Sequence, residues 1–163
     1  MSAPYKLTKT DQGSYLFTSD IGLEYTCFFI ACPITDNDGN DHLIYSFGFD
    51  RSGKFKSIRY ANRFDERIKF TIIYIIKEFF RINGDNALLY FCYPDDTFAR
   101  HRSITFSRWY NEELSDDIDH FKKDSAYKDE MLYDGMLILK KNPFHKLLND
   151  AVDVYIAEMN NQK

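Results

Sequence analysis

The first third of the chain contains short runs in which β-branched and aromatic residues alternate with polar ones, the pattern of half-buried strands. Two such runs, 14–19 and 23–32, are separated by a short segment that ends in Gly22, which suits a hairpin turn. We expect these two strands to pair antiparallel.

Two further runs predict a third and a fourth strand at 43–49 and 55–60. The segment 36–41 before the third strand is dense in Asp, Asn and Gly, and a second tight turn is expected at 51–54. On one face of the third strand we expect Leu43, Tyr45, Phe47 and Phe49. The four strands together predict an antiparallel meander.

The spacing of apolar residues then changes from two to about 3.6, which predicts a largely buried helix over 65–82. The residues expected on its buried stripe are Ile68, Ile72, Ile75, Ile76 and Phe79, with Ile73, Tyr74 and Phe80 widening it. Asn62, Asp65 or Glu66 is able to cap the start of this helix, and Asn83-Gly84 suits its end.

The next run, 87–93, is apolar throughout and predicts an inner strand, parallel to a neighbour across the preceding helix. A helix is expected at 97–113, with Asp95 or Asp96 as its cap. Its predicted core face is thin and consists of Phe98, Ala99, Phe106, Trp109 and Tyr110.

The segment 111–130 contains eight acidic residues and three lysines, and we expect a solvated linker with a fraying helix there. A last strand is predicted at 131–140, and Asn142-Pro143 suits the start of a terminal helix. The apolar stripe expected on that helix consists of Phe144, Leu147, Leu148, Ala151, Val154 and Tyr155.

The fold class predicted from these elements is α+β, in the order ββββ-α-β-α-β-α. We expect a mixed, largely antiparallel sheet covered by the helix 65–82 and by the C-terminal helix. A chain of 163 residues is within the usual range of one domain, so a single domain over 1–163 is expected.

Composition narrows the class of protein. Apolar residues make up 44% of the chain and aromatic residues 17%, enough to form a core, which argues against global disorder. A net charge of −4 disfavours a nucleic-acid partner. No run reaches the roughly 18 apolar residues of a membrane span, and the start of the chain does not have the pattern of a signal peptide. We therefore expect a cytoplasmic location and no membrane partner.

Cysteine and histidine often bind metals or take part in redox chemistry, but their positions in this sequence favour structural roles. Cys27, Cys32 and Cys92 lie in or beside apolar runs, which predicts buried, reduced thiols. The histidines do not have the spacing of a zinc site, so no metal is expected.

Basic residues gather near the starts of the two inner helices. The stretch 51–69 holds seven basic residues against Asp65 and Glu66, and the second helix adds further arginines. Free N–H groups at a helix start bind phosphate, so we expect a cofactor site for coenzyme A or another phosphate-bearing ligand. Its predicted residues are Arg63, Arg67, Lys69, Asp95, Asp96 and Arg100. The alternatives are that the basic residues form solvated faces and that the two aspartates only cap their helix.

Several segments resemble a family of short bacterial proteins that carry a domain of unknown function. They read YKLT…GSYLFTSDIGLEYTCFF, IYSFGF, DERIKFTIIYIIKEFF, LLYFCYPDD, ARHRSITFSRWY and NPFHKLLNDA, and span roughly 5–155. The resemblance implies a single-domain soluble protein, without an activity to transfer.

The order of elements is also similar, more distantly, to GNAT-type acyltransferases. In these proteins a strand, a phosphate-binding loop, a helix and a strand precede a helix opened by N-x-x-A, and here Asp96-Thr97-Phe98-Ala99 takes that last position. The loop position holds residues 63–68 without glycine, and the tyrosine that often acts as general acid falls near Ser103.

Two functions follow from these observations. The first is a GNAT-like acyltransferase, or a degenerate relative, that binds an anionic small molecule. The second is a non-enzymatic protein-interaction module that docks through the acidic stretch 111–130 and the basic stretch 51–69, with another protein or a second copy of itself as partner.

Overall fold

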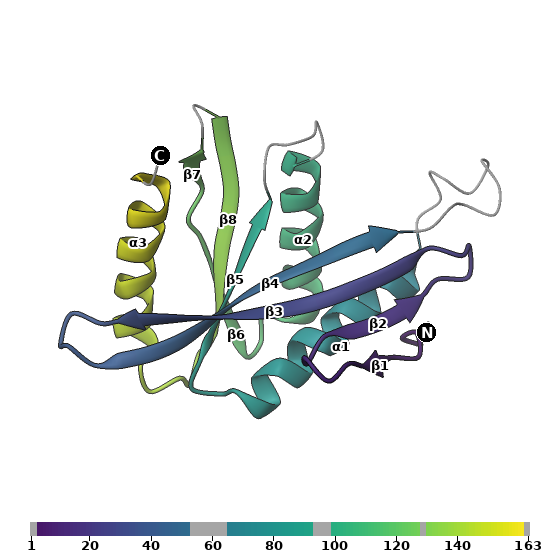
Figure 1. Cartoon of the computed structure of the whole chain (residues 1–163), viewed down its shortest axis with the longest axis horizontal. Coiled ribbons are helices and arrows are strands. Elements are labelled where there is room, and N and C mark those ends of the chain that lie inside the picture. Colours follow the sequence, from purple (N-terminus) through teal and green to yellow (C-terminus); the bar gives the residue numbers. More distant parts are fainter. Residues whose placement is uncertain (1–2, 53–64, 93–98, 128–129, 162–163) are drawn as a thin grey trace. The chain divides into compact units, whose positions relative to one another are not determined.

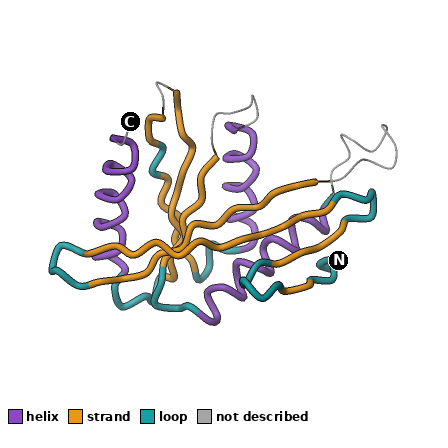
Figure 2. The backbone as a smooth tube through the Cα atoms, in the orientation of Figure 1, coloured by secondary structure: helices purple, strands orange, loops and turns teal. Residues whose placement is uncertain are grey.

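The computed structural model describes residues 3–52, 65–92, 99–127 and 130–161 (Figure 2). The chain divides into two compact units. Unit 1 consists of residues 1–29 and 48–82, and unit 2 of residues 30–47 and 83–163. The expectation of one domain over the whole chain stays a prediction.

Among the described elements, four strands precede the first helix, one strand separates the first two helices, and three strands precede the last helix (Figure 1). These elements are β1 (Thr8–Lys9), β2 (Tyr15–Thr18), β3 (Glu24–Thr35), β4 (Asp41–Ser52), α1 (Glu66–Ile82), β5 (Ala87–Cys92), α2 (Ala99–Glu113), β6 (Ile118–Lys122), β7 (Ser125–Tyr127), β8 (Glu130–Leu139) and α3 (His145–Asn161). The strands follow one another in the order β1-β2-β3-β4-β5-β8-β6, and β7 pairs with β8. The predicted α+β class with a mixed sheet is confirmed.

In unit 1 the predicted hairpin is confirmed: β2 and β3 pair antiparallel, from Tyr15 opposite Cys27 to Thr18 opposite Glu24. Gly22 in the connecting turn has φ 88°, a conformation that glycine adopts without strain. The sequence pattern did not predict β1, which pairs with β2 over only two residues.

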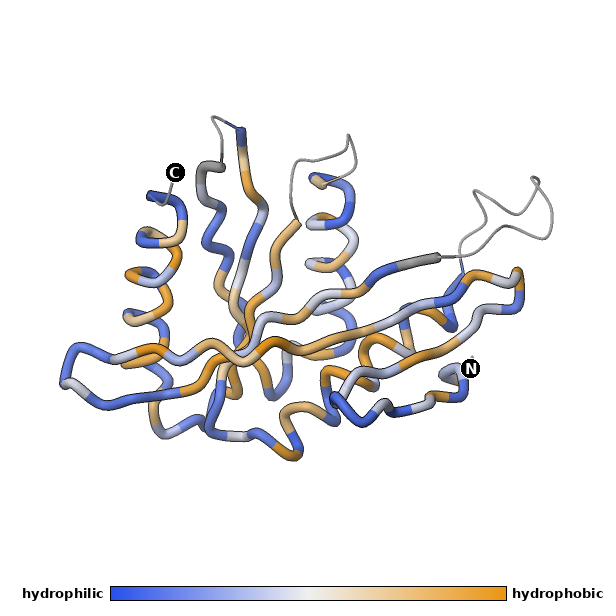
Figure 3. The backbone as a smooth tube through the Cα atoms, in the orientation of Figure 1, coloured by the Kyte–Doolittle hydropathy of each residue, from blue (hydrophilic) through white to orange (hydrophobic). Residues whose placement is uncertain are grey.

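Helix α1 confirms the central prediction of the sequence pattern. Ile72, Ile75 and Ile76 are fully buried, and Phe79 stacks on Phe29 of β3 with ring centroids 5.1 Å apart. Figure 3 shows the concentration of hydrophobic residues along this helix. Tyr74 was expected to widen the buried stripe, but it is 48% exposed because it lies on the opposite side of the helix.

Strand β4 runs further than predicted. It continues to Ser52, so residues 51 and 52, where a turn was expected to begin, belong to the strand instead. The strand predicted at 55–60 is outside the described residues. At the start of the hairpin with β3, Asp36 accepts hydrogen bonds from the backbone N–H groups of Asp38 and Asn40, which explains the dense run of turn residues there.

Unit 2 contains the parallel pair that the apolar run 87–93 predicted. β4 and β5 run parallel, from Ile44 opposite Ala87 to Phe47 opposite Tyr90. β5 then pairs antiparallel with β8, and β8 pairs antiparallel with β6. Among the pairings described for this sheet, the β4–β5 pair is the parallel one, so the sheet is mixed and largely antiparallel.

The prediction of a linker over 111–130 is wrong. Leu114 and Ile118 are buried, and the segment forms β6 and β7 beside β8. The physical reason is that burial of Leu114 and Ile118, packing of Phe121 against the core of unit 2 and pairing with β8 outweigh the local charge. Asp119, one of the acidic residues in β6, is paired with His145 at 2.8 Å.

Helix α3 begins at His145, two residues after the start predicted at Pro143, and the Asn142 side chain accepts a hydrogen bond from the Phe144 N–H at 2.7 Å in the turn before it. Its buried stripe differs from the predicted one, since Val154 is 50% exposed and Phe144, which precedes the helix, is 36% exposed. The residues of α3 that pack into the core of unit 2 are Leu148, Ala151, Val152 and Ile156, against Leu89 of β5 and Met136 and Ile138 of β8.

Helix α2 packs on the other face of the sheet in unit 2, since the side chains of successive β5 residues point to opposite faces. Leu89 belongs to the core below α3, whereas the Tyr90 ring lies 4.6 Å from the ring of Phe106 in α2. Among the described helices, none combines the length and the apolar character needed to cross a membrane.

Candidate functional site

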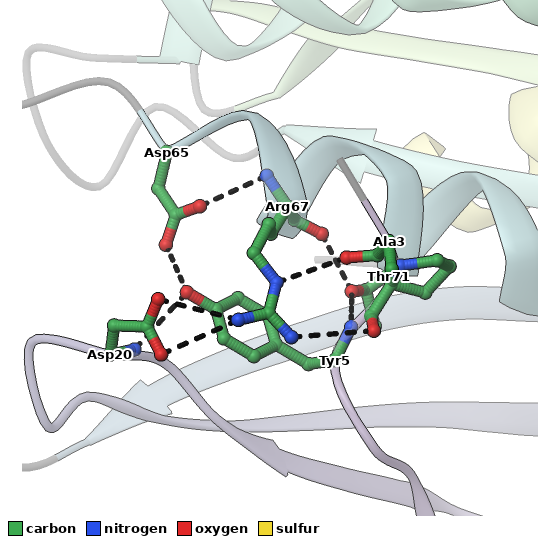
Figure 4. Close-up of polar contacts among 7 residues, drawn as sticks. Ala3, Tyr5, Asp20, Asp65, Arg67 and Thr71 are labelled. Carbon is green, nitrogen blue, oxygen red and sulfur yellow. Dashed lines mark hydrogen bonds and ion pairs between the residues drawn. The ribbon is translucent and has the colours of Figure 1, made fainter. Parts of the chain in front are cut away.

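Arg67 is the predicted site residue with the most extensive contacts, and it lies in unit 1 on the first turn of α1 (Figure 4). Its guanidinium stacks on the Tyr5 ring at 3.9 Å from the ring centroid. The same group donates to the carbonyl of Ala3 at 3.0 Å and to that of Pro4 at 3.5 Å, and it forms an ion pair with Asp20 at 3.3 Å. Arg67 therefore fastens residues 3–5 and the β2–β3 turn to α1.

Asp65 caps the same helix. One carboxylate oxygen accepts the Arg67 N–H at 2.9 Å, and the other accepts the Tyr5 hydroxyl at 2.5 Å. Burial, followed by the hydrogen bond to Asp65, raises the pKa of Tyr5 to about 12. The structure thus selects Asp65 among the three proposed caps, and the start of α1 already carries a carboxylate where a phosphate was expected.

The other predicted ligand-binding residues are in different situations. Lys69 is 7% exposed, so its stem is buried in unit 1. Arg100 belongs to unit 2, on the exposed side of α2. Arg63, Asp95 and Asp96 are outside the described residues. Whether the six residues form one site stays a prediction.

A second polar cluster lies in unit 2, below α2, and the sequence pattern did not single it out. The Tyr90 hydroxyl on β5 and His120 Nε2 on β6 are 2.5 Å apart. Aromatic rings surround the imidazole: Tyr110 lies at 4.9 Å and Phe106 at 6.1 Å between ring centroids. The pair is therefore held in place from α2 and from two strands.

Burial determines the protonation states of this pair. It lowers the pKa of His120 to about 4, with a smaller contribution from Lys122, so the imidazole is neutral at pH 7. Burial also raises the pKa of Tyr90, which keeps its proton. The result is a neutral pair joined by one short hydrogen bond, able to donate or accept a proton through the tyrosine oxygen.

Gly135 on β8 makes room for the pair. It lies directly opposite Tyr90, and a Cβ atom at this position would be 2.6 Å from the Tyr90 hydroxyl oxygen. Real Cβ atoms do not approach that closely, so the position of the hydroxyl depends on glycine here.

The cysteines differ in burial. Cys27 is fully buried, as predicted, and burial raises its pKa to about 12. Cys32 and Cys92 are only half-buried. Burial raises the pKa of the Cys92 thiol, opposed by Arg102, so a reactive thiolate is not favoured. Within the described part of the chain, no three His, Cys, Asp or Glu side chains are grouped to hold a metal ion.

Asp134 is a further titratable group buried in unit 2. It is 1% exposed, and Ser125 donates to one of its carboxylate oxygens at 2.9 Å. The second oxygen is buried without a hydrogen-bond partner. Burial raises the pKa of Asp134 to about 6, which eases the cost of this unpaired atom because the acid is partly protonated near that pH.

The Ser103 position, where the GNAT likeness expects a general acid, does not provide one. Ser103 is 5% exposed and lies in the buried face of α2. Tyr90, on the strand before this helix, is the described tyrosine whose hydroxyl meets a histidine.

Comparison with known proteins decides the family. The model of a family of unknown function, DUF6169, matches residues 64–155, more than half of the chain. The chain belongs to the DUF6169 family. No curated protein and no solved structure matches it.

The matched span of this DUF6169 protein divides the two clusters. Tyr90, His120 and Gly135 all lie inside it, whereas Tyr5 and Asp20 lie before it. The cluster below α2 is therefore built entirely from the part of the chain that defines the family.

Sequence reasoning missed the Tyr90–His120 pair for an identifiable reason. His120 lies in the stretch taken for a linker, so its strand was not placed beside β8. The local pattern gave little signal, because the two apolar residues of this strand, Ile118 and Phe121, lie on opposite faces and the residues between and after them are polar.

Proposed function

We propose that this DUF6169 protein is a GNAT-like acyltransferase, or a degenerate relative of one, that binds an anionic ligand of the coenzyme A type. The observation that carries the proposal is that β4 and β5, which precede and follow α1 along the chain, pair parallel and are followed by α2. The likeness to these enzymes places the first strand at 55–60, which is outside the described residues; β4 is the described strand before α1 that pairs parallel with β5. Open sheets bind ligands at the carboxyl ends of parallel strands. A bacterial source and a cytoplasmic location belong to the same proposal.

Among the residues proposed to contact phosphate, the described contacts favour Arg100. Arg67 stacks on Tyr5 and pairs with Asp20, and Lys69 is buried. The side chain of Arg100 is exposed on the first turn of α2, close to N–H groups that have no partner inside the helix. We therefore assign the decisive phosphate contact to Arg100.

For a catalytic version of this function, we assign the proton donor to Tyr90. When an amine nitrogen attacks the thioester carbonyl, the C–N bond forms, the C–S bond breaks and the departing thiolate needs a proton. Tyr90 keeps its hydroxyl proton because it is buried, and His120 shares a hydrogen bond with it. A carboxylate would receive the proton that the amine loses, and a backbone carbonyl would only orient the N–H group and pass its proton to water.

The first test is thermal unfolding with and without millimolar coenzyme A. A ligand that binds the folded protein raises the melting temperature through RT ln(1 + [L]/Kd). We expect a rise for the parent and a smaller rise for Arg100→Ala. Arg108→Ala is the matched control, because Arg108 is on the same helix and is occupied by Glu112 at 4.0 Å.

An unchanged melting temperature of the parent with coenzyme A and with nucleotides would contradict ligand binding. A loss of the shift in both arginine variants would contradict the assignment to Arg100 and indicate a general charge effect instead.

The second candidate function is a non-enzymatic interaction module. The specific observation in its favour is that Asp65 and Arg67, at the expected phosphate site, already have partners within the chain. Asp65 accepts hydrogen bonds from the Tyr5 hydroxyl and the Arg67 N–H, and the Arg67 guanidinium pairs with Asp20. The partner proposed from charge is a second copy, through the acidic 111–130 and basic 51–69 stretches. Failure of coenzyme A binding, together with a dimer that dissociates as salt increases, would establish this candidate instead.

A further inference from the structure

A pocket of about 460 Å³ lies in unit 1 between the N-terminal segment and α1. This volume is in the range of small-molecule sites. The residues that line it are Pro4, Tyr5, Leu7, Lys9, Tyr15, Tyr74, Glu78 and Ile82. The pocket is thus aromatic and aliphatic, with one carboxylate and one ammonium group.

The contribution of α1 is a stripe on its outward side. Tyr74, Glu78 and Ile82 follow one another at intervals of four residues. Tyr74 is 48% exposed and Ile82 57% exposed, although the opposite side of the same helix is completely buried. The core of unit 1 does not require these two large side chains, which are free to meet a ligand.

The opposite wall is held rigidly by the contacts described above. The Tyr5 N–H donates to Thr71 of α1 at 2.8 Å, and Arg67 binds the carbonyls of Ala3 and Pro4. The pocket is therefore formed before any ligand arrives, which lowers the entropic cost of binding.

A cation is already stabilised in this pocket. The Lys9 ammonium lies 5.6 Å from the centroid of the Tyr15 ring, within the range of a cation–π contact. Glu78 lines the same pocket, and its pKa is lowered by the hydrogen bond from Arg81 and, to a smaller extent, by the charge of Lys9. Arg81 already donates to both oxygens of Glu78, so the face of the Tyr15 ring is the group that favours positive charge, with Lys9 as the occupant supplied by the chain itself.

We propose that this pocket binds an alkylammonium group, which lies against Tyr15 and Tyr74 and takes the place of the Lys9 ammonium. Lys9 is on the exposed strand β1, so its side chain is able to move into water. Tyr5 contributes an edge only, because Arg67 covers one face of its ring and the ring stacks with Phe17. This inference does not depend on acyl transfer.

The test compares choline with 3,3-dimethylbutan-1-ol, a neutral molecule of the same shape. Binding to the full chain is followed by NMR or calorimetry. We expect choline to bind. We expect the neutral alcohol to bind roughly two- to fivefold more weakly, which is the range of a cation–π contact at an exposed site. Lys9→Ala should tighten choline binding, because it removes the competing ammonium.

Variants of Tyr74 test the role of its ring. Tyr74→Ala should weaken choline binding, and Tyr74→Phe, which keeps the ring, should retain it. Because this side chain is exposed, we expect both variants to fold like the parent, and the melting temperature of each variant checks this. Equal binding of choline and the neutral alcohol, or no saturable binding of either, would overturn the proposal, as would a Lys9→Ala variant that binds choline more weakly than the parent.

The alkylammonium group can belong to a free small molecule or to a methylated lysine of another protein. A short peptide that contains trimethyllysine, compared with the same peptide containing unmodified lysine, distinguishes the two. Tighter binding of the trimethylated peptide than of choline assigns the site to a protein partner, and the reverse order assigns it to a small molecule.

Discussion

The Tyr90 hydroxyl occupies space that glycine leaves on the facing strand. Gly135 is opposite Tyr90 in the β5–β8 register, and His120 reaches the same oxygen from β6. Three strands therefore converge on one oxygen atom, and its position depends on the absence of a side chain as much as on the hydrogen bond.

Gly135→Ala tests this dependence. The added Cβ would lie 2.6 Å from the Tyr90 oxygen, so either the ring or the backbone must shift. We expect the free energy of unfolding to fall by about 1–3 kcal/mol, the usual cost of overpacking a core. Urea unfolding measures it. The added atom would also lie 2.8 Å from Cζ and 2.9 Å from Cε1 of the same ring, so Tyr90→Phe should recover only part of the loss. An undiminished loss in the double variant would assign the strain to the ring carbons instead of the hydroxyl.

At the scale of single residues, the sequence predicted which side chains are buried better than it predicted which side chains contact one another. The fully buried isoleucines of α1 follow directly from their spacing. The contacts of Arg67 with Tyr5 and Asp20 join positions that are 62 and 47 apart in the chain, and no local pattern indicates such contacts. Arg67 was predicted as a ligand-binding residue, which stays a prediction, and the sequence pattern did not show that it anchors Tyr5 and the β2–β3 turn.

The helices illustrate how far periodicity defines an element. In α1 most of the predicted stripe is buried, but Ile68 is only half-buried and Tyr74 is exposed. In α3 apolar residues occur on both sides, and a stripe one position out of register included Val154 and omitted Val152 and Ile156. A helix with fewer charged residues on its outer face leaves the orientation ambiguous.

Ile76→Ala, compared with Ile82→Ala, tests the orientation of α1. Ile76 is fully buried and Ile82 is 57% exposed on the same helix. We expect a loss of about 2–5 kcal/mol for Ile76→Ala, as for other large-to-small changes in a core, and a much smaller loss for Ile82→Ala. Urea midpoints give both values, and equal midpoints for the two variants would contradict the described packing.

Across the whole molecule, the class of fold was predictable and the site was not. The changes from alternating to helical spacing revealed the order of elements, including the parallel neighbour of β5. The acidic residues around β6 hid a strand that borders the Tyr90 cluster. Three of the six predicted ligand-binding residues, Arg63, Asp95 and Asp96, lie outside the described residues, so sequence alone supports their assignment.

The stability of the molecule should depend on pH through two opposing groups. His120 has a pKa of about 4 in the folded protein against 6.5 ordinarily, so the unfolded chain binds more protons between these values and acidification destabilises the fold. Asp134 has a pKa of about 6 against 3.8, so the folded protein binds more protons there and acidification stabilises it.

Single substitutions should separate these contributions. In His120→Gln the effect of Asp134 remains, and the free energy of unfolding should rise relative to the parent as pH falls from 6.5 to 4.5. In Asp134→Asn the effect of His120 remains, and it should fall relative to the parent. Urea unfolding at several pH values measures the slopes. Parallel slopes for both variants and the parent would show that neither group titrates as described.

The division into two units has a consequence for fragments of the chain. Each unit is discontinuous: the chain enters unit 1, passes to unit 2 at residue 30, returns at residue 48 and leaves again at residue 83. A piece limited to the family match, residues 64–155, would keep α1 without the strands of its own unit. It would also remove Ile34, Ile44 and Ile156 from the core of the other unit. The residues matched by the family model therefore do not correspond to a unit that we expect to fold independently.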